Sequence, residues 1–196
     1  MAAGAVIAAA AAAAKRRKDD ADAIARSLEP WARLAKERKL EFTSASGAPA
    51  IEGELLGVKC RAWIELDRNG FGHTRITAVP LTDVEGKVFL VPNPGGALGF
   101  LKHAFTQDVS VGDEAFDEAF LVRAEPESLA PALLGPSLRA FIAPLAVRKL
   151  TSFVYEHGKV ELHFPDVEVQ TEWVAAALDA AVEAARWVPP RDTPFR

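Results

Sequence analysis

The strongest constraint on the fold is how strand-like and helix-like patterns are distributed along the chain. Between Val58 and Leu66 small or apolar residues alternate with larger or charged ones, so the two sets point to opposite faces of a strand. Asn69-Gly70 follows, and this dipeptide favours the tight turn of a β-hairpin. Residues 73–79 are therefore expected to return as the paired strand.

Shorter strand patterns continue through the middle of the chain. They are expected at 87–91, at 116–124, and at 148–156 and 159–164, the last two being joined by a hairpin turn at His157-Gly158. Helical segments are expected on both sides of Gly135-Pro136, within residues 128–142. Clustered strands with helices at both ends of the chain predict an α+β fold, with an antiparallel or mixed sheet, helices packed on one face and an Ala-rich N-terminal helix.

The two ends of the domain carry helical periodicity. In the first segment, over 21–40, Trp31, Leu34 and Ala35 are expected to dock on the domain. Pro30 interrupts that pattern, which predicts a kink or a restart of the helix with Ser27 as its cap. The closing helix is expected to start at a Thr171 cap and to end before Pro189-Pro190. Its apolar face comprises Val174, Leu178, Ala181, Val182 and Ala185.

The first 14 residues are uncharged and mostly alanine, and the basic run 15–18 follows them. This order is the reverse of a secretory signal, and a membrane helix of this polarity would leave the domain in the cytoplasm. Fourteen helical residues rise only about 21 Å, against about 30 Å of hydrocarbon. Three interpretations stay open: a weak or shortened membrane anchor, an exposed or partner-bound helix, and a low-complexity tail. The residues expected to contact a membrane or a partner are Lys15, Arg16, Arg17 and Lys18.

We therefore divide the chain into a lead over 1–20, a single domain over 21–190 and a tail over 191–196. The net charge of −4 and pI near 5.6 argue against nucleic acid as a partner. The single cysteine, Cys60, lies in a strand pattern and is expected to be a buried thiol, which suits a reducing compartment. The expected location is the cytoplasm, or the inner membrane with the domain facing the cytoplasm.

No motif for a cofactor or a metal is present, so neither is expected. The four histidines lack the i, i+4 spacing of a helical metal site, and Gly95-Gly96-Ala97-Leu98-Gly99 lacks the Gly-Lys-Ser or Gly-Lys-Thr of a phosphate loop. His157 and His163 are expected to be solvated surface residues. No motif assigns catalytic residues. If the protein is an enzyme, the candidates are His73, Arg75, Asp113 and Asp117.

Several segments together resemble a type of uncharacterised bacterial protein that has a short apolar N-terminus, a basic patch and one domain of unknown function. The segments that carry the resemblance are 1–18, 31–42, 52–57, 74–77, 112–120 and the leucine-rich helix 128–143. This resemblance implies the layout of the chain and implies no activity.

The interpretation that the sequence favours is a non-enzymatic binding or assembly domain, held near a membrane or against a protein partner by its lead helix. One alternative is a small-ligand sensor with an apolar cavity between the sheet and helix 128–143. The other is an enzyme of unrecognised type that uses the four candidates named above.

Overall fold

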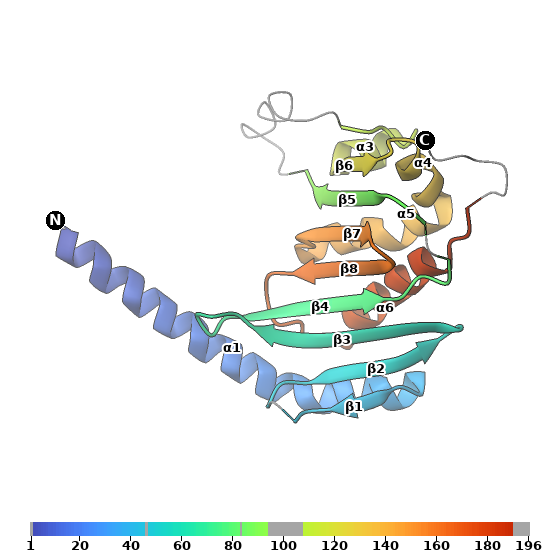
Figure 1. The fold of residues 1–196 in the computed structure, drawn as a ribbon. Helices are drawn as coiled ribbons and strands as arrows, with labels where there is room; N and C mark the ends of the chain where they lie inside the picture. Colours follow the sequence, from blue (N-terminus) through green and yellow to red (C-terminus); the bar gives the residue numbers. More distant parts are fainter. Residues whose placement is uncertain (1, 46, 83, 94–107, 190–196) are drawn as a thin grey trace.

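The computed structural model describes residues 2–45, 47–82, 84–93 and 108–189, and it has the α+β architecture that the sequence predicts (Figure 1). The strands are β1 (Glu41–Thr43), β2 (Ala50–Leu55), β3 (Val58–Leu66), β4 (Gly72–Ala78), β5 (Lys87–Pro92), β6 (Phe120–Glu125), β7 (Ser152–Glu156) and β8 (Lys159–Phe164). The helices are α1 (Ala2–Arg38), α3 (Glu114–Ala119), α4 (Leu129–Leu133), α5 (Pro136–Ile142), the 3-10 helix η2 (Ala143–Arg148) and α6 (Thr171–Arg186). The Gly95–Gly99 loop and the tail over 191–196 lie outside the described residues.

The strands form one eight-stranded sheet in the order β1-β2-β3-β4-β8-β7-β5-β6, and every pair is antiparallel. The hairpins β3–β4 and β7–β8 are those that the turn residues predict. His157 and Gly158 both have positive φ, as a tight hairpin turn requires. The non-local pairs β4–β8 and β5–β7 join the hairpins into one sheet.

Alternation along β3 divides the sheet into a covered and an open face. Val58, Cys60, Ala62 and Ile64 are buried, while the intervening residues are exposed or half-buried. The same alternation holds along β4 and β8. α6 packs against β3, β4 and β8, and α1 contacts β1, β2, β4 and α6, so both helices cover the same face of the sheet. Figure 1 shows the helices behind the sheet, with the open face toward the viewer. The core lies between these two layers.

The helix α1 runs through Pro30 as one element, so the expected restart at Ser27 is wrong. Ser27 is fully buried within the helix, and its Oγ donates to the Ile24 carbonyl over 2.7 Å instead of capping a new helix. Trp31, Leu34 and Ala35 are buried in the core, as predicted. Burial of Trp31 alone offsets a cost of about 3 kcal/mol for a proline inside a helix.

The expected strand over 116–124 is partly wrong, because residues 114–119 form α3 and the strand β6 starts only at Phe120. Asp113 is the N-cap of α3, and its Oδ1 accepts a hydrogen bond from the Phe116 backbone over 3.2 Å. Phe116 and Phe120 stack with their ring centroids 4.6 Å apart. Their spacing of four residues fits a helical turn as well as one face of a strand, which explains the error.

The closing helix α6 has the predicted apolar face, all of which is buried. Its N-cap is Gln170, and Thr171 is its first residue, so Thr171 is not the cap. In the part of the chain that the structure describes, none of the helices combines the length and the hydrophobicity that a membrane span requires.

Candidate functional site

The helical phase of α1 divides the predicted contact residues at 15–18 into two groups. Lys15, Arg17 and Lys18 are exposed, whereas Arg16 contacts the domain. Its Nη2 atom donates to the Pro165 carbonyl over 3.1 Å, and its guanidinium lies 4.4 Å from the centre of the Phe71 ring. Arg16 is therefore an anchor of the helix, and the other three remain available to a partner.

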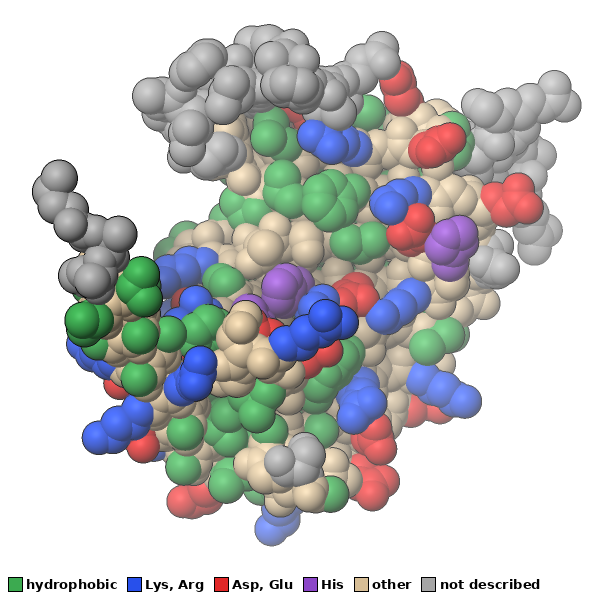
Figure 2. Space-filling model, turned by 60° about the vertical axis from the view of Figure 1, so that its left-hand side comes forward, with side chains coloured by type: hydrophobic (Ala, Val, Ile, Leu, Met, Phe, Trp, Pro, Cys, Tyr) green, Lys and Arg blue, Asp and Glu red, His purple; other side chains and the backbone are tan. Residues whose placement is uncertain are grey.

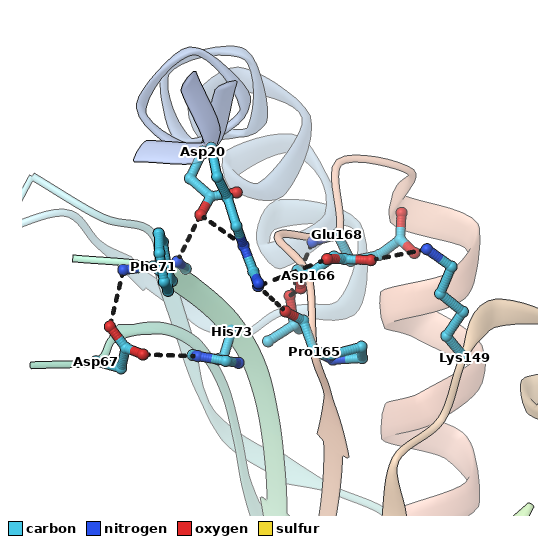
Figure 3. A network of polar contacts seen from close by, with 11 residues as sticks. Asp20, Asp67, Phe71, His73, Lys149, Pro165, Asp166 and Glu168 are labelled. Atoms are coloured by element: carbon cyan, nitrogen blue, oxygen red, sulfur yellow. Dashed lines mark hydrogen bonds and ion pairs between the residues drawn. The ribbon is translucent and has the colours of Figure 1, made fainter. Parts of the chain in front are cut away.

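A polar network surrounds this anchor, and we call it the α1 junction: Arg16 and Asp20 of α1 with the 67–72 turn and residues 165–166 (Figure 3). Asp20 accepts a hydrogen bond from the Gly72 backbone over 3.0 Å. A Cβ atom at Gly72 would lie 2.3 Å from Val167, so only glycine fits this close approach.

Asp67 fixes the shape of the turn that receives α1. One of its oxygens accepts hydrogen bonds from the backbone of Phe71 and of Asn69, over 2.9 and 2.8 Å. The hydrogen bond from Phe71 is the main cause that lowers the pKa of Asp67, with those from Asn69 and His73 adding to it. The turn thus presents the Phe71 ring to Arg16 in a defined position (Figure 3).

Two further contacts fix α1 to the C-terminal part of the chain. The indole Nε1 of the fully buried Trp31 donates to the Glu168 carbonyl over 2.9 Å. Arg38 forms a two-point ion pair with Asp179 of α6. From residue 16 to residue 38 the helix is therefore tied to the domain at four places, namely Arg16, Asp20, Trp31 and Arg38.

The first part of the same helix stands apart from the domain, and we call residues 2–14 of α1 the α1 arm (Figure 1). Residues 5–12 are all exposed, and Val6 and Ile7 keep 68% and 70% of their surface accessible. A helix that is anchored from residue 16 onward and exposed over residues 5–12 presents a defined surface to a partner.

The open sheet face carries a second group of polar side chains. The His73 and His163 rings lie 5.4 Å apart between their centroids, and Arg75 bonds Glu65 and Glu161 over 2.9 and 2.7 Å. His163 is half-buried, and one nitrogen of each imidazole is shielded from solvent without a hydrogen-bond partner. The expectation that His163 is a solvated surface residue is therefore wrong, whereas His157 is 90% exposed as expected.

Burial is the main cause that lowers the pKa of His163, and the electrostatic influence of Arg75 and of His73 lowers it further. These effects favour the neutral form of the His163 imidazole over the charged form. The pair lacks a third ligand: in the described part of the chain, no three His, Cys, Asp or Glu side chains are grouped to hold a metal.

Figure 2 shows basic, acidic, histidine and hydrophobic side chains interspersed on this side of the molecule. Toward β5, β6 and β7 the open face mixes apolar and charged side chains. Half-buried Phe89, Val91, Leu121 and Val154 lie there in the same rows as exposed Lys87 and Arg123.

The four candidates for an enzyme do not converge on one pocket. His73 and Arg75 lie on β4, whereas Asp113 and Asp117 belong to α3, which precedes β6. β4 and β6 are four strand positions apart in the sheet, about 19 Å. Asp113 instead pairs with Arg139 over 3.2 Å, and Asp117 accepts hydrogen bonds from residues 110 and 111.

The sensor hypothesis requires an apolar cavity between helix 128–143 and the sheet, and the cleft beside this helix lies elsewhere. A cleft of about 230 Å³ lies between α4, α5 and α6 on the helical side, lined by Leu133, Leu138, Glu183 and Arg186 among others. Toward the sheet, the large side chains of α4 and α5 are buried in the core.

The elements and the sheet define an α+β protein with an antiparallel sheet and a long N-terminal helix. The chain is similar to the crystal structure of the mycobacterial trehalose monomycolate transport factor A, TtfA, with a TM-score of 0.55 and 11% sequence identity. The similarity covers 87% of this chain and 98% of TtfA, and at this identity it shows the fold alone. No family model and no curated protein matches the chain.

Sequence reasoning missed the partners of Arg16 in the α1 junction. The basic run is evident in the sequence. Which of its residues faces the domain depends on the helical phase and on the turn that Arg16 contacts. Asp67 followed by Asn69-Gly70 was the available signal, because an Asp two residues before an Asn or Gly commonly bonds the turn backbone.

Proposed function

We propose that this protein is a non-enzymatic binding or assembly factor, and that the α1 arm is the element by which it attaches to its partner. The observation that carries the proposal is the division of α1 into a part held by Arg16, Trp31 and Arg38 and an apolar part with no cover from the described chain. Leaving Val6 and Ile7 in water is unfavourable, so a partner that covers them gains their burial.

The similarity to TtfA is compatible with this role. That protein is called a transport factor, and its fold extends over almost all of both chains. The geometry of α1 is nevertheless the main support for this role, because a similarity at 11% identity shows only that the folds are alike.

A photo-crosslinking experiment in cells tests the proposal. A photoreactive amino acid at Ala9, in the arm, is expected to give a reproducible crosslinked product. The same group at Lys36, exposed on the part of α1 that is held by the domain, is expected to give none. A shortened form of the protein controls the result.

Deleting residues 2–12 removes most of the arm and keeps Arg16 and Asp20, so the α1 junction and the fold should survive. This shortened chain is expected to lose any co-fractionation that the full chain shows. Equal co-fractionation of the two forms, together with no product from position 9, would contradict the proposal.

A further inference from the structure

Three features of α1 together specify one kind of partner: the apolar arm, the basic residues 15–18 that follow it, and the length of the arm. We propose that the α1 arm enters an anionic lipid surface end-on, with Lys15, Arg17 and Lys18 at the level of the lipid phosphates. This inference rests on the proposed function, because it names the partner of the same arm.

The arm has no polar face to leave in water. Residues 2–14 consist of alanine, one glycine, Val6 and Ile7, so no side chain carries a charge or a hydrogen-bonding group. A helix that docks in a protein groove usually has one apolar stripe and one polar face, as α6 does in this molecule. A helix that is apolar all round suits an environment that surrounds it completely, which a bilayer does.

The charges at the root of the arm encircle the helix. Successive residues of an α-helix are separated by about 100°, so positions 15–18 cover most of its circumference. Arg16 faces the domain, and Lys15, Arg17 and Lys18 point elsewhere and are exposed. The aliphatic part of Arg17 passes the 67–72 turn at Gly70, and Arg68 of that turn is also exposed. The result is a collar of positive charge where the apolar segment ends.

The charge of the domain itself favours this orientation. Four of the 23 Lys and Arg residues lie in the run 15–18, whereas all 27 Asp and Glu residues lie after it. The rest of the chain is therefore acidic and is repelled by anionic lipid, so the arm end approaches the surface first.

The length of the arm limits how it can attach. Thirteen helical residues rise about 20 Å, which is shorter than a hydrocarbon core of about 30 Å. Residues 2–14 by themselves therefore reach into the hydrocarbon core and do not span it. Alanine contributes little to insertion, so Val6, Ile7 and the basic collar supply most of the affinity, and binding should weaken as salt is raised.

Vesicle co-sedimentation of the full chain measures this directly. The probes are vesicles of equal parts phosphatidylcholine and phosphatidylglycerol, and vesicles of phosphatidylcholine alone. Binding is expected to the first kind and to be at least tenfold weaker to the second. Lys15→Gln with Lys18→Gln should weaken binding about 30-fold, since each basic residue near an anionic surface contributes about 1 kcal/mol.

The matched control changes the net charge equally at a distance from the arm. Lys36→Gln with Lys59→Gln removes two exposed lysines for which the described structure gives no ion pair, and it should leave binding unchanged. Ile7→Asn should also weaken binding, and it cannot act by unfolding the domain, because Ile7 is 70% exposed.

A fluorescent label reports where the arm lies. The one native thiol, Cys60, is buried, so a polarity-sensitive dye on Ile7→Cys labels the arm selectively. Its emission should shift to the blue with anionic vesicles, whereas the dye on Lys36→Cys should not respond.

The inference is overturned by the absence of binding to anionic vesicles, or by equal losses in the Lys15/Lys18 and Lys36/Lys59 double variants. A dye on the arm that stays in water in the presence of these vesicles would overturn it as well. Should the Ala9 crosslink to a protein persist in any of these cases, the proposed function stands and only the lipid partner is rejected.

Discussion

Arg38 at the C-terminal end of α1 and Asp179 in the middle of α6 form a two-point ion pair. The Nη1 and Nη2 atoms donate to Oδ1 and Oδ2 over 2.8 and 2.9 Å. The hydrogen bonds from Arg38 to Asp179 are the main cause that raises the pKa of the guanidinium above its ordinary value. The pair connects residues 141 positions apart and joins α1 to α6.

The first prediction concerns this pair. Both side chains are about one third exposed, which reduces the strength of the interaction below that of a buried pair. A double-mutant cycle with Arg38→Ala and Asp179→Ala should give a coupling of about 1 kcal/mol in the free energy of unfolding. Arg38→Lys keeps the positive charge but cannot form both hydrogen bonds to the carboxylate. It should therefore recover less than half of the free energy of unfolding that Arg38→Ala loses. Additive effects of the two alanine substitutions in urea denaturation would show that the pair does not couple the helices.

The second prediction concerns Trp31, the largest fully buried side chain of α1. Trp31→Ala should lower the free energy of unfolding by about 3–5 kcal/mol, because it leaves a cavity where α1 meets the sheet. Trp31→Phe keeps most of the volume and removes the donor to the Glu168 carbonyl, so it should cost about 1–3 kcal/mol. Trp187, at the C-terminal end of α6, provides the control: Trp187→Phe should cost less than Trp31→Phe.

The packing of α1 shows how much of the fold can be predicted from the sequence. Apolar periodicity was sufficient to predict that Trp31, Leu34 and Ala35 dock, since burial of these residues depends on one helix face. The same reasoning placed a restart at Pro30, because the local cost of proline was visible and the tertiary gain that offsets it was not. The burial of Ser27 follows from that continuity and could not be foreseen.

The sites were less predictable than the elements. The His73–His163 pair exists because β4 lies beside β8, and no local signal indicates that two hairpins about 90 residues apart will share an edge. The role of Arg16 likewise depends on Phe71, 55 residues further along the chain, and on the Pro165 carbonyl, 149 residues further along. The register between strands that are distant in sequence decides such contacts, and no pattern in a single sequence shows that register.

The third prediction concerns the pH dependence of stability. The pKa of His163 is lower in the folded protein than its ordinary value of 6.5, mainly through burial. The unfolded chain therefore binds more protons as pH falls below about 6.5, and stability is lost from there toward the folded-state pKa. The nearby Arg75 and His73 lower this pKa further, and Glu161 and Glu65 act in the opposite direction.

Urea denaturation between pH 5 and pH 7.5 measures the effect. The free energy of unfolding should rise with pH over this range, and His163→Gln should flatten the rise. His157→Gln removes an imidazole that is 90% exposed and serves as the control for loss of a histidine. A slope that is the same in His163→Gln and in the parent protein would contradict the assignment.

The last prediction concerns the Cys60 thiol. Its side chain belongs to the buried row of β3, and burial raises the pKa of the thiol to about 11. Because the thiolate is the reactive form, the thiol should react with a disulfide reagent at pH 8 only as fast as the domain opens. In denaturant the reaction should be complete and fast. A cysteine placed at Ile7, on the exposed arm, should react at the rate of a free thiol in the same native sample, which controls for the reagent. Fast stoichiometric reaction of native Cys60 would mean that β3 is accessible from solvent, and the division of the sheet into a covered and an open face would have to be revised.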